Sequence, residues 1–180
     1  MHGASPPSPW FLAQRARLAD AARLGPVLDL ACGRGRHALA AAELGAATLA
    51  IDRDEGALRT LQALADRRRL PLQALRADLE TPFGIPVRTG SCGVILVFRF
   101  LFRPLAAAIV EALAPGGLLL YETFTVAQRA LGTGPRRADF LLEPGELAAL
   151  FSDLEPIEYA EDRSDGDPPE CLARLAARRA

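Results

Sequence analysis

The sequence predicts an α/β fold in which helices pack on a mostly parallel sheet, and three observations carry this prediction. Residues 27–30 form an apolar run that ends at a glycine-rich turn and leads directly into an alanine-rich segment. Alanine and leucine residues then repeat at helical spacing over residues 57–65. The near-continuous apolar run at residues 93–98 is typical of a central parallel strand buried on both faces. Strands that alternate with helices in this way form a layered α/β domain.

Turn and capping signals set the bounds of the expected elements. Ser8 and Pro9 are typical of a helix start, and Gly25 followed by Pro26 ends this helix. The turn signal at residues 164–167 separates two strand-like runs, which predicts a terminal antiparallel hairpin. The remaining elements are expected as helices at 36–44, 55–69, 105–113 and from 143, and as strands at 46–51, 72–76, 93–98, 118–120, 157–161 and 171–178.

Length and composition limit the classes of function that this chain can have. The 180 residues suffice for one α/β domain but not for a separate substrate domain. The formal net charge of −1 predicts no global attraction to nucleic acid or to a membrane surface. The three cysteines are isolated in the sequence and predict neither a metal site nor a disulfide framework. Because neither a targeting signal nor a membrane-spanning apolar run is visible, we expect a cytoplasmic protein.

The glycine-rich loop after the first strand is the candidate ligand-binding element. Gly33 and Gly35 permit backbone torsions and a close approach that a Cβ would block. The first N–H groups of the following helix have no partner within the helix and attract anionic or polar groups. The dinucleotide fingerprint G-x-G-x-x-G/A fits residues 33–38, and Asp52 lies at about the expected distance along the chain. The loop alone therefore leaves the kind of nucleotide ligand open.

Asp29 favours a different ligand. Residues 28–35 resemble the first motif of class I S-adenosylmethionine-dependent methyltransferases. In that family a carboxylate at the position of Asp29 is directed toward the ammonium group of the methionine moiety. NAD has no such ammonium group. A glycine turn that only reverses the chain is a poor explanation, because a buried aspartate costs several kcal/mol unless something satisfies it.

Later motifs occur in the order typical of the same family. Asp52 ends the second strand, where a carboxylate accepts hydrogen bonds from a ribose diol. Residues 77–79 resemble the position that binds the adenine edge, and residues 115–117 resemble the turn into the fifth strand. The resemblance implies S-adenosylmethionine as cofactor and a Rossmann-like seven-stranded sheet, mostly parallel with an antiparallel last strand, with helices on both faces. The cofactor-binding residues that it implies are Asp29, Ala31, Cys32, Gly33, Gly35, Asp52, Arg53, Asp78, Leu79 and Phe98.

The segment at residues 99–104 is where this family places side chains that face the methyl acceptor. It lacks the aspartate, histidine or Asn-Pro-Pro-Tyr motif that would serve an amide nitrogen of DNA or protein. Arginine and aromatic side chains suit a small acceptor that is a soft anion or is anionic and planar, although the phenylalanines could equally belong to the core. The sequence identifies no catalytic residue, because in-line transfer of an activated methyl group depends mainly on alignment and requires a base only if the acceptor carries a proton. The expected acceptor-binding residues are Trp10, Arg99, Phe102 and Arg103.

These expectations define one domain, 1–180, with four parts. They are an N-terminal helix or lid (1–25), a cofactor-binding core (26–124), a flap (125–143), and a C-terminal helix and hairpin (144–180). The short length, the N-terminal helix and residues 144–147 are similar to the tellurite-resistance TehB-like branch of the family.

Two other function classes stay open beside a methyltransferase acting on a small molecule. An RNA methyltransferase would use arginines at residues 67–69, 136–137 and 178–179 as a track for phosphates. A catalytically silent module would bind S-adenosylmethionine without turnover. We expect a small-molecule partner in preference to nucleic acid and no membrane partner, and the sequence predicts no oligomeric state.

Overall fold

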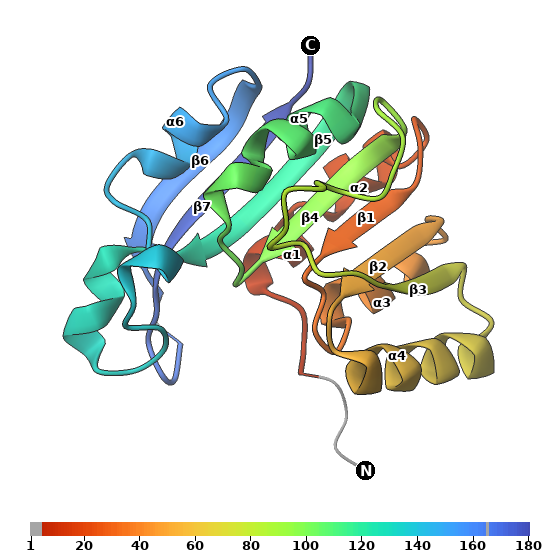
Figure 1. Cartoon of the computed structure of the whole chain (residues 1–180), viewed down its shortest axis with the longest axis horizontal. Coiled ribbons are helices and arrows are strands. Elements are labelled where there is room, and N and C mark those ends of the chain that lie inside the picture. Colours follow the sequence, from red (N-terminus) through yellow and green to blue (C-terminus); the bar gives the residue numbers. More distant parts are fainter. Residues whose placement is uncertain (1–4, 165) are drawn as a thin grey trace.

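The computed structural model describes residues 5–164 and 166–180, so Asp165 of the expected turn lies outside the described residues. Within these residues, seven strands form one sheet in the order β3-β2-β1-β4-β5-β7-β6 (Figure 1). Strands β1 to β5 are parallel, whereas β7 runs antiparallel to both β5 and β6. This confirms the predicted fold class. The strands are β1 (Val27–Leu30), β2 (Thr48–Asp52), β3 (Leu72–Arg76), β4 (Cys92–Phe98), β5 (Leu113–Phe124), β6 (Glu155–Arg163) and β7 (Cys171–Arg178).

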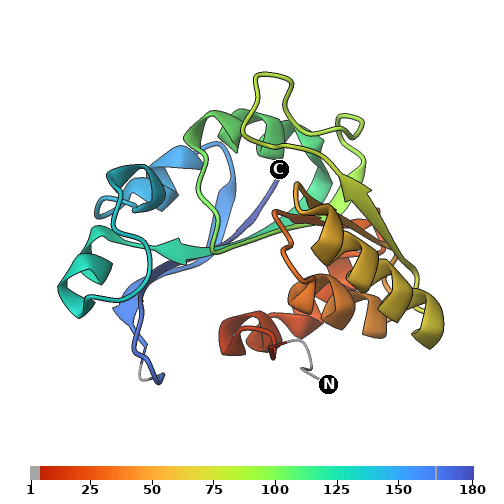
Figure 2. The same ribbon diagram turned by 60° about the horizontal axis from the view of Figure 1, so that its bottom comes forward.

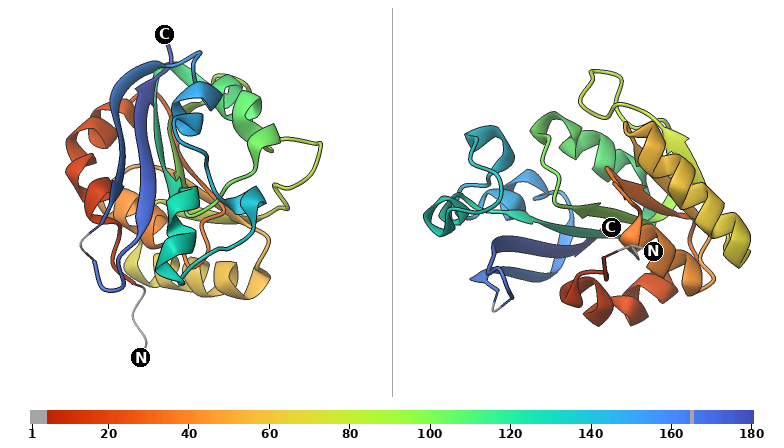
Figure 3. Two further views of the ribbon diagram at one scale, coloured as in Figure 1. Left: turned by 90° about the vertical axis from the view of Figure 1, so that its left-hand side faces the viewer. Right: turned by 90° about the horizontal axis from the view of Figure 1, so that it is seen from below.

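Helices cover both faces of the sheet, as Figures 2 and 3 show. Helices α1 to α4 lie on one face, and α5 and α6 lie on the other. None of the helices in the described residues is long and apolar enough to cross a membrane. The α-helices are α1 (Pro9–Ala13), α2 (Arg15–Ala21), α3 (Arg36–Glu43), α4 (Glu55–Arg68), α5 (Ala106–Ala112) and α6 (Glu146–Leu150), and the 3-10 helices are η1 (Arg103–Leu105), η2 (Val126–Leu131) and η3 (Ala138–Phe140).

The central strand β4 explains why one sheet can carry two helical layers. All seven of its residues are buried. Ile95 and Val97 pack on the side of α5 and α6, whereas Val94, Leu96 and Phe98 pack on the side of α1 and α2. Because successive side chains of a strand point to opposite faces, an apolar run of this length fills both cores.

The N-terminal segment departs from the prediction of one continuous helix. It forms two short helices, α1 and α2, which meet at Gln14. The side chain of Gln14 is buried, and its Nε2 donates to Glu158 Oε2 in β6 (3.0 Å). Trp10 Nε1 donates to the other oxygen of Glu158 (2.8 Å). A residue that is distant in sequence thus binds side chains on either side of the break between the two helices.

The segment predicted as a flap is anchored at its base. Gln128 is fully buried, and its Oε1 accepts a hydrogen bond from the Cys171 N–H (2.7 Å). Its Nε2 donates to the carbonyl oxygen of Thr133 (3.0 Å). A bridge between Thr125 and Leu142 closes the segment. The segment 125–143 is therefore held at both ends and contains η2 and η3.

Candidate functional site

A cleft of about 250 Å³ opens at the carboxyl ends of β1, β2 and β3. This is the edge at which open parallel sheets bind ligands. Five of its lining residues are among those predicted to bind the cofactor, and they come from three separate strand ends. The lining residues are Ala31, Asp52, Arg53, Ala77, Asp78, Leu79, Glu80 and Phe100.

The glycine loop beside this cleft uses its two glycines for different purposes. Gly35 has a φ of +74° and begins α3, and a Cβ there would lie 2.5 Å from the Leu61 side chain of α4. Gly33 has a φ of +55°, and a Cβ there would meet no protein atom within 4 Å. Gly35 therefore serves helix packing, whereas Gly33 leaves open space in front of the loop.

Asp52 holds this loop against the end of β2. Its Oδ2 accepts a hydrogen bond from the Gly33 N–H (2.7 Å), and its Oδ1 accepts one from the Asp54 N–H (2.9 Å). Each carboxylate oxygen has a further lone pair, so the same group can still accept a pair of hydroxyl donors from a ligand in the cleft.

Asp29 lies beneath the loop in β1 and is only 1% exposed. Its Oδ2 accepts a hydrogen bond from the Ala38 N–H in the first turn of α3 (2.9 Å), where the N-cap residue Gly35 offers no side chain. Burial raises the pKa of the Asp29 carboxyl to about 7, and the nearby charge of Asp52 adds to the shift. A cationic ligand group close to Asp29 would favour its ionised form.

The electrostatics of the site favour a cation over a diphosphate. Asp52, Asp78 and Glu80 line the cleft, against one arginine, Arg53, which lies 3.8 Å from Glu80. The Gly33 N–H, which could otherwise bind a phosphate, already donates to a carboxylate. A pyrophosphate would meet these negative charges, whereas a sulfonium or ammonium group would be attracted by them. The dinucleotide interpretation of the loop is therefore disfavoured.

Phe98, predicted to bind the cofactor, does not line this cleft. Its ring stacks on His37 at 3.8 Å between centroids and lies 6.1 Å from the ring of Trp10. Phe100, two residues further on, lines the cleft instead, and Tyr121 Oη donates to its carbonyl oxygen (3.0 Å). The sequence indicated Phe100 only as part of the acceptor segment, because the course of the chain after β4 has no local signal.

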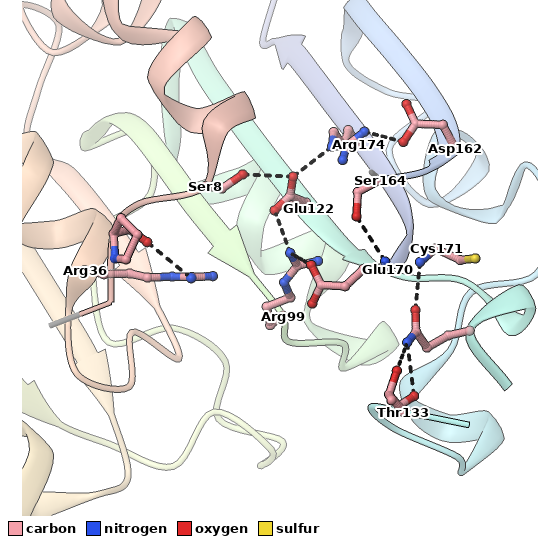
Figure 4. Close-up of polar contacts among 12 residues, drawn as sticks. Ser8, Arg36, Arg99, Glu122, Thr133, Asp162, Ser164, Glu170, Cys171 and Arg174 are labelled. Carbon is pink, nitrogen blue, oxygen red and sulfur yellow. Dashed lines mark hydrogen bonds and ion pairs between the residues drawn. The ribbon is translucent and has the colours of Figure 1, made fainter. Parts of the chain in front are cut away.

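Arg99, predicted to bind the acceptor, lies in a cluster of charged side chains beyond the end of β4 (Figure 4). Its Nη2 lies 2.6 Å from Glu170 Oε2 and 3.4 Å from Glu122 Oε1. Its guanidinium carbon lies 4.8 Å from the centre of the Phe124 ring. The backbone of Arg99 has a φ of +60°, which is uncommon for a residue other than glycine. Arg99 is thus held by residues that are distant in sequence.

Within the described residues, the other predicted acceptor residues form no hydrogen bond or ion pair with Arg99. Arg103 donates from Nη2 to the Leu141 carbonyl oxygen (2.9 Å) and pairs with Glu146, which joins the end of the segment 125–143 to α6. Phe102 precedes η1 and packs against the core on the side of α5. Trp10 lies beside Phe98 on the side of α1 and α2, opposite to Phe102, and Ser8 at the start of the same helix donates to Glu122, a partner of Arg99.

Comparison with known proteins settles the family. The profile of a family described as "Methyltransferase domain" matches residues 27–117, which include β1, the glycine loop, the cleft residues and the turn into β5. The chain belongs to this methyltransferase family. A curated relative, the ribosomal protein L11 methyltransferase of Dechloromonas aromatica (strain RCB), is 32% identical over 152 residues. That alignment covers 83% of this chain, and the chain spans 43% of the length of the relative.

Solved structures of methyltransferases share the fold. TehB from Haemophilus influenzae matches with a TM-score of 0.72 at 22% identity, over 92% of this chain and 62% of that one. An S-adenosylmethionine-dependent methyltransferase from Mesorhizobium loti matches with a TM-score of 0.69 at 20% identity, over 93% of this chain and 98% of that one. The resemblance to class I methyltransferases is therefore confirmed, and family membership implies S-adenosylmethionine as the methyl donor.

The sequence predicts that Asp52 binds the ribose of the cofactor. The Asp52→Ala variant should then bind S-adenosylmethionine at least about tenfold more weakly than wild type, because a charge-assisted hydrogen bond contributes about 1.5–3 kcal/mol. Calorimetric titration measures this. The matched control is Asp54→Ala, which removes the acceptor of the Ala57 N–H (3.0 Å) at the start of α4 and should lower thermal stability alone. Equal affinities for wild type and a folded Asp52→Ala protein would place the ribose elsewhere.

Proposed function

We propose that this protein transfers the methyl group of S-adenosylmethionine to a small acceptor that carries an anionic group. The cofactor occupies the cleft at the ends of β1 to β3, with the ribose at Asp52, the adenine beside Asp78 and Leu79, and the methionine moiety over the glycine loop. Asp29 provides the countercharge for the ammonium group of that moiety. The acidic lining of the cleft and the open space in front of Gly33 support this placement.

The proposed acceptor class rests on one observation, which concerns the Nη1 atom of Arg99. This atom is buried and forms no hydrogen bond within the described residues. Figure 4 shows the Arg36 guanidinium extending from α3 toward the same region, and its charge contributes to a lowered pKa of Arg99, of which burial is the main cause. Arg36 itself donates to the Pro6 carbonyl oxygen at 3.4 Å. Glu122 and Glu170 pair with Arg99 through Nη2, so Nη1, together with the Arg36 guanidinium, is the donor that an anionic group of the acceptor would bind.

The arrangement of the other arginines supports a small acceptor over RNA. Residues 67–69 lie at the carboxyl end of α4, residues 136–137 lie between η2 and η3, and residues 178–179 lie at the far end of β7. Figure 1 shows these three places at separate corners of the molecule. They do not form the continuous track that several successive phosphates require.

The Arg99→Ala variant should leave the affinity for S-adenosylmethionine within about twofold of wild type and lower methyl transfer to an anionic acceptor at least about tenfold. Of the two ligands, only the acceptor loses a charge-assisted hydrogen bond. Arg163→Ala, an exposed arginine at the end of β6, is the control and should have no effect. Transfer rates at saturating cofactor decide the question, and equal rates in the Arg99→Ala protein would move the acceptor site away from β4.

A screen with labelled S-adenosylmethionine tests the proposed function itself. The acceptors are 2-hydroxybenzoate, 2-aminobenzoate, 2-mercaptobenzoate and iodide, with a short RNA and purified ribosomal proteins as alternatives. We expect label in at least one of the small anions. Label in RNA or protein alone would contradict the proposed acceptor class, and failure of the protein to bind S-adenosylmethionine would contradict the proposed function as a whole.

A further inference from the structure

A buried carboxylate, Glu122, forms the centre of the charged cluster shown in Figure 4. It lies near the end of β5 and is 1% exposed. Its Oε2 accepts hydrogen bonds from Arg174 Nε (2.8 Å) and from Ser8 Oγ (3.0 Å). Arg174 in turn pairs with Asp162 of β6. Glu122 thus meets guanidinium groups from two sides, Arg174 and Arg99, which compensate for the burial of its charge.

Two atoms of this cluster are left without a hydrogen bond. Among the buried side-chain nitrogen and oxygen atoms of the described residues, Arg99 Nη1 and Glu122 Oε1 have no hydrogen-bond partner. One is a donor and the other an acceptor, and they belong to side chains that approach to 3.4 Å. Native proteins rarely leave buried polar atoms unpaired, because each buried atom without a hydrogen bond costs about 1–3 kcal/mol of stability. The pair is therefore suited to a group that offers one acceptor and one donor side by side.

The position of Glu122 in the sheet brings it toward the glycine loop. Phe98 pairs with Glu122 between β4 and β5, and Leu30 pairs with Val97 between β1 and β4. The start of the loop and Glu122 are therefore at the same edge, two strand spacings or about 10 Å apart. Ser8 spans this gap, because its N–H donates to His37 Nε2 in α3 (3.1 Å) while its hydroxyl donates to Glu122.

The geometry points to Glu122 as the residue that receives the proton of the acceptor, in a subsite that it forms with Arg99. This inference rests on the proposed function and deepens it. Arg99 Nη1 donates to an anionic oxygen of the acceptor, while Glu122 Oε1 accepts the O–H, N–H or S–H of the adjacent nucleophile. As the nucleophile forms its bond to the methyl carbon, the bond from that carbon to the sulfonium sulfur breaks and the sulfur keeps the electron pair. The proton of the nucleophile passes to Glu122 Oε1 and leaves to solvent after product release.

A carboxylate between two guanidiniums is a weak base, but this reaction requires no stronger one. The nucleophile becomes strongly acidic as it gains the methyl group, so the proton moves late and to a modest acceptor. Entry to the subsite is on the side of Glu170, whose side chain is 32% exposed and pairs with Arg99. An entering anion binds Arg99 Nη1, and the Glu170 carboxylate keeps its ion pair with Nη2. The substrate class is therefore an anion with a proton-bearing nucleophile next to its charge.

The test compares nucleophiles with and without a proton in the Glu122→Gln variant. With 2-hydroxybenzoate or 2-aminobenzoate, transfer should fall at least about 100-fold, within the range that general base catalysis contributes. With iodide, which carries no proton, the rate should change less than about threefold. Calorimetry without any methyl donor should show tighter binding of 2-hydroxybenzoate than of 2-methoxybenzoate to wild type, and the variant should lose this preference.

The control variant is Asp162→Asn, which alters the outer partner of Arg174 without contact to Glu122 and should keep wild-type rates. Thermal unfolding and titration with S-adenosylmethionine show whether each variant is folded and binds the cofactor. Unchanged transfer to 2-hydroxybenzoate in folded Glu122→Gln, or an equal loss with iodide, would overturn the inference while leaving the proposed function intact. Absence of transfer by wild type to every small anion would instead contradict the proposed acceptor class.

Discussion

Gly33→Val should lose at least about 100-fold in affinity for S-adenosylmethionine, or about 2.7 kcal/mol, while the protein stays folded. In the protein alone, a Cβ at this position meets nothing within 4 Å. The added side chain therefore enters the space in front of the loop, which we assign to the cofactor. The Gly33 N–H should keep its hydrogen bond to Asp52, so the base of the site should remain in place.

The variant also has a conformational cost that must be separated from its effect on binding. A φ of +55° is unfavourable for a β-branched residue and costs about 1–3 kcal/mol. Gly45→Val is the matched control, because Gly45 has a φ of +85° and equally open surroundings at the opposite end of α3. Both variants should melt at lower temperature than wild type, but only Gly33→Val should fail to bind. If both bound S-adenosylmethionine normally by calorimetry, the loop would not approach the cofactor.

The contrast between Gly33 and Gly35 shows what the sequence could predict at this site. The spacing of the two glycines, the preceding apolar strand and the helix start are local features, and they predicted the loop correctly. Which glycine packs on a helix and which faces open space depends on Leu61, a residue of another element. Local patterns carry no information about such a contact.

Local sequence patterns also could not predict the contacts of Arg99, the residue proposed to bind the acceptor. The apolar run of β4 and the arginine after it were visible in the sequence, but the partners of Arg99 come from β5 and from the segment before β7. Glu122 could have been found by one signal, because it is a charged residue within the otherwise apolar strand that follows residues 115–117. The break of the N-terminal helix at Gln14 had no such signal, and the partner of the Gln14 side chain, Glu158 of β6, is distant in sequence.

Asp29→Asn should have the largest effect on cofactor binding among charge-neutralising variants. The loss should exceed about 100-fold, because removal of one partner from a buried ion pair costs about 3–5 kcal/mol. An asparagine keeps the acceptor for the Ala38 N–H, so α3 should retain its cap. Methylthioadenosine, which shares the adenosine but lacks the ammonium group, is the control ligand. Its affinity should be the same for both proteins, and an equal loss of both ligands would show that the variant disturbs the loop instead.

Although Asp29→Asn is expected to weaken cofactor binding, its folded state should gain stability relative to wild type as the pH rises. Burial raises the pKa of Asp29 from 3.8 to about 7, so the folded protein retains a proton that the unfolded chain releases. The stability of wild type therefore falls as the pH rises from about 4 to about 7 and remains lower above that, by about 4 kcal/mol for a shift of this size. Asparagine does not titrate. The melting temperature of the variant relative to wild type should consequently increase between about pH 4 and pH 8, and thermal scans across this range measure it.

Cofactor affinity of wild type should show the matching pH dependence. Below about pH 7 the Asp29 carboxyl is largely protonated in the free protein, and a bound ammonium group favours the ionised form, so binding releases a proton. The association constant should then fall by up to about tenfold per pH unit between about pH 7 and pH 5. Calorimetry in two buffers of different ionisation enthalpy counts the released proton. In Asp29→Asn the affinity should be low and constant over this range. A constant affinity in wild type would mean that the ammonium group does not bind at Asp29, whatever the affinity of the variant.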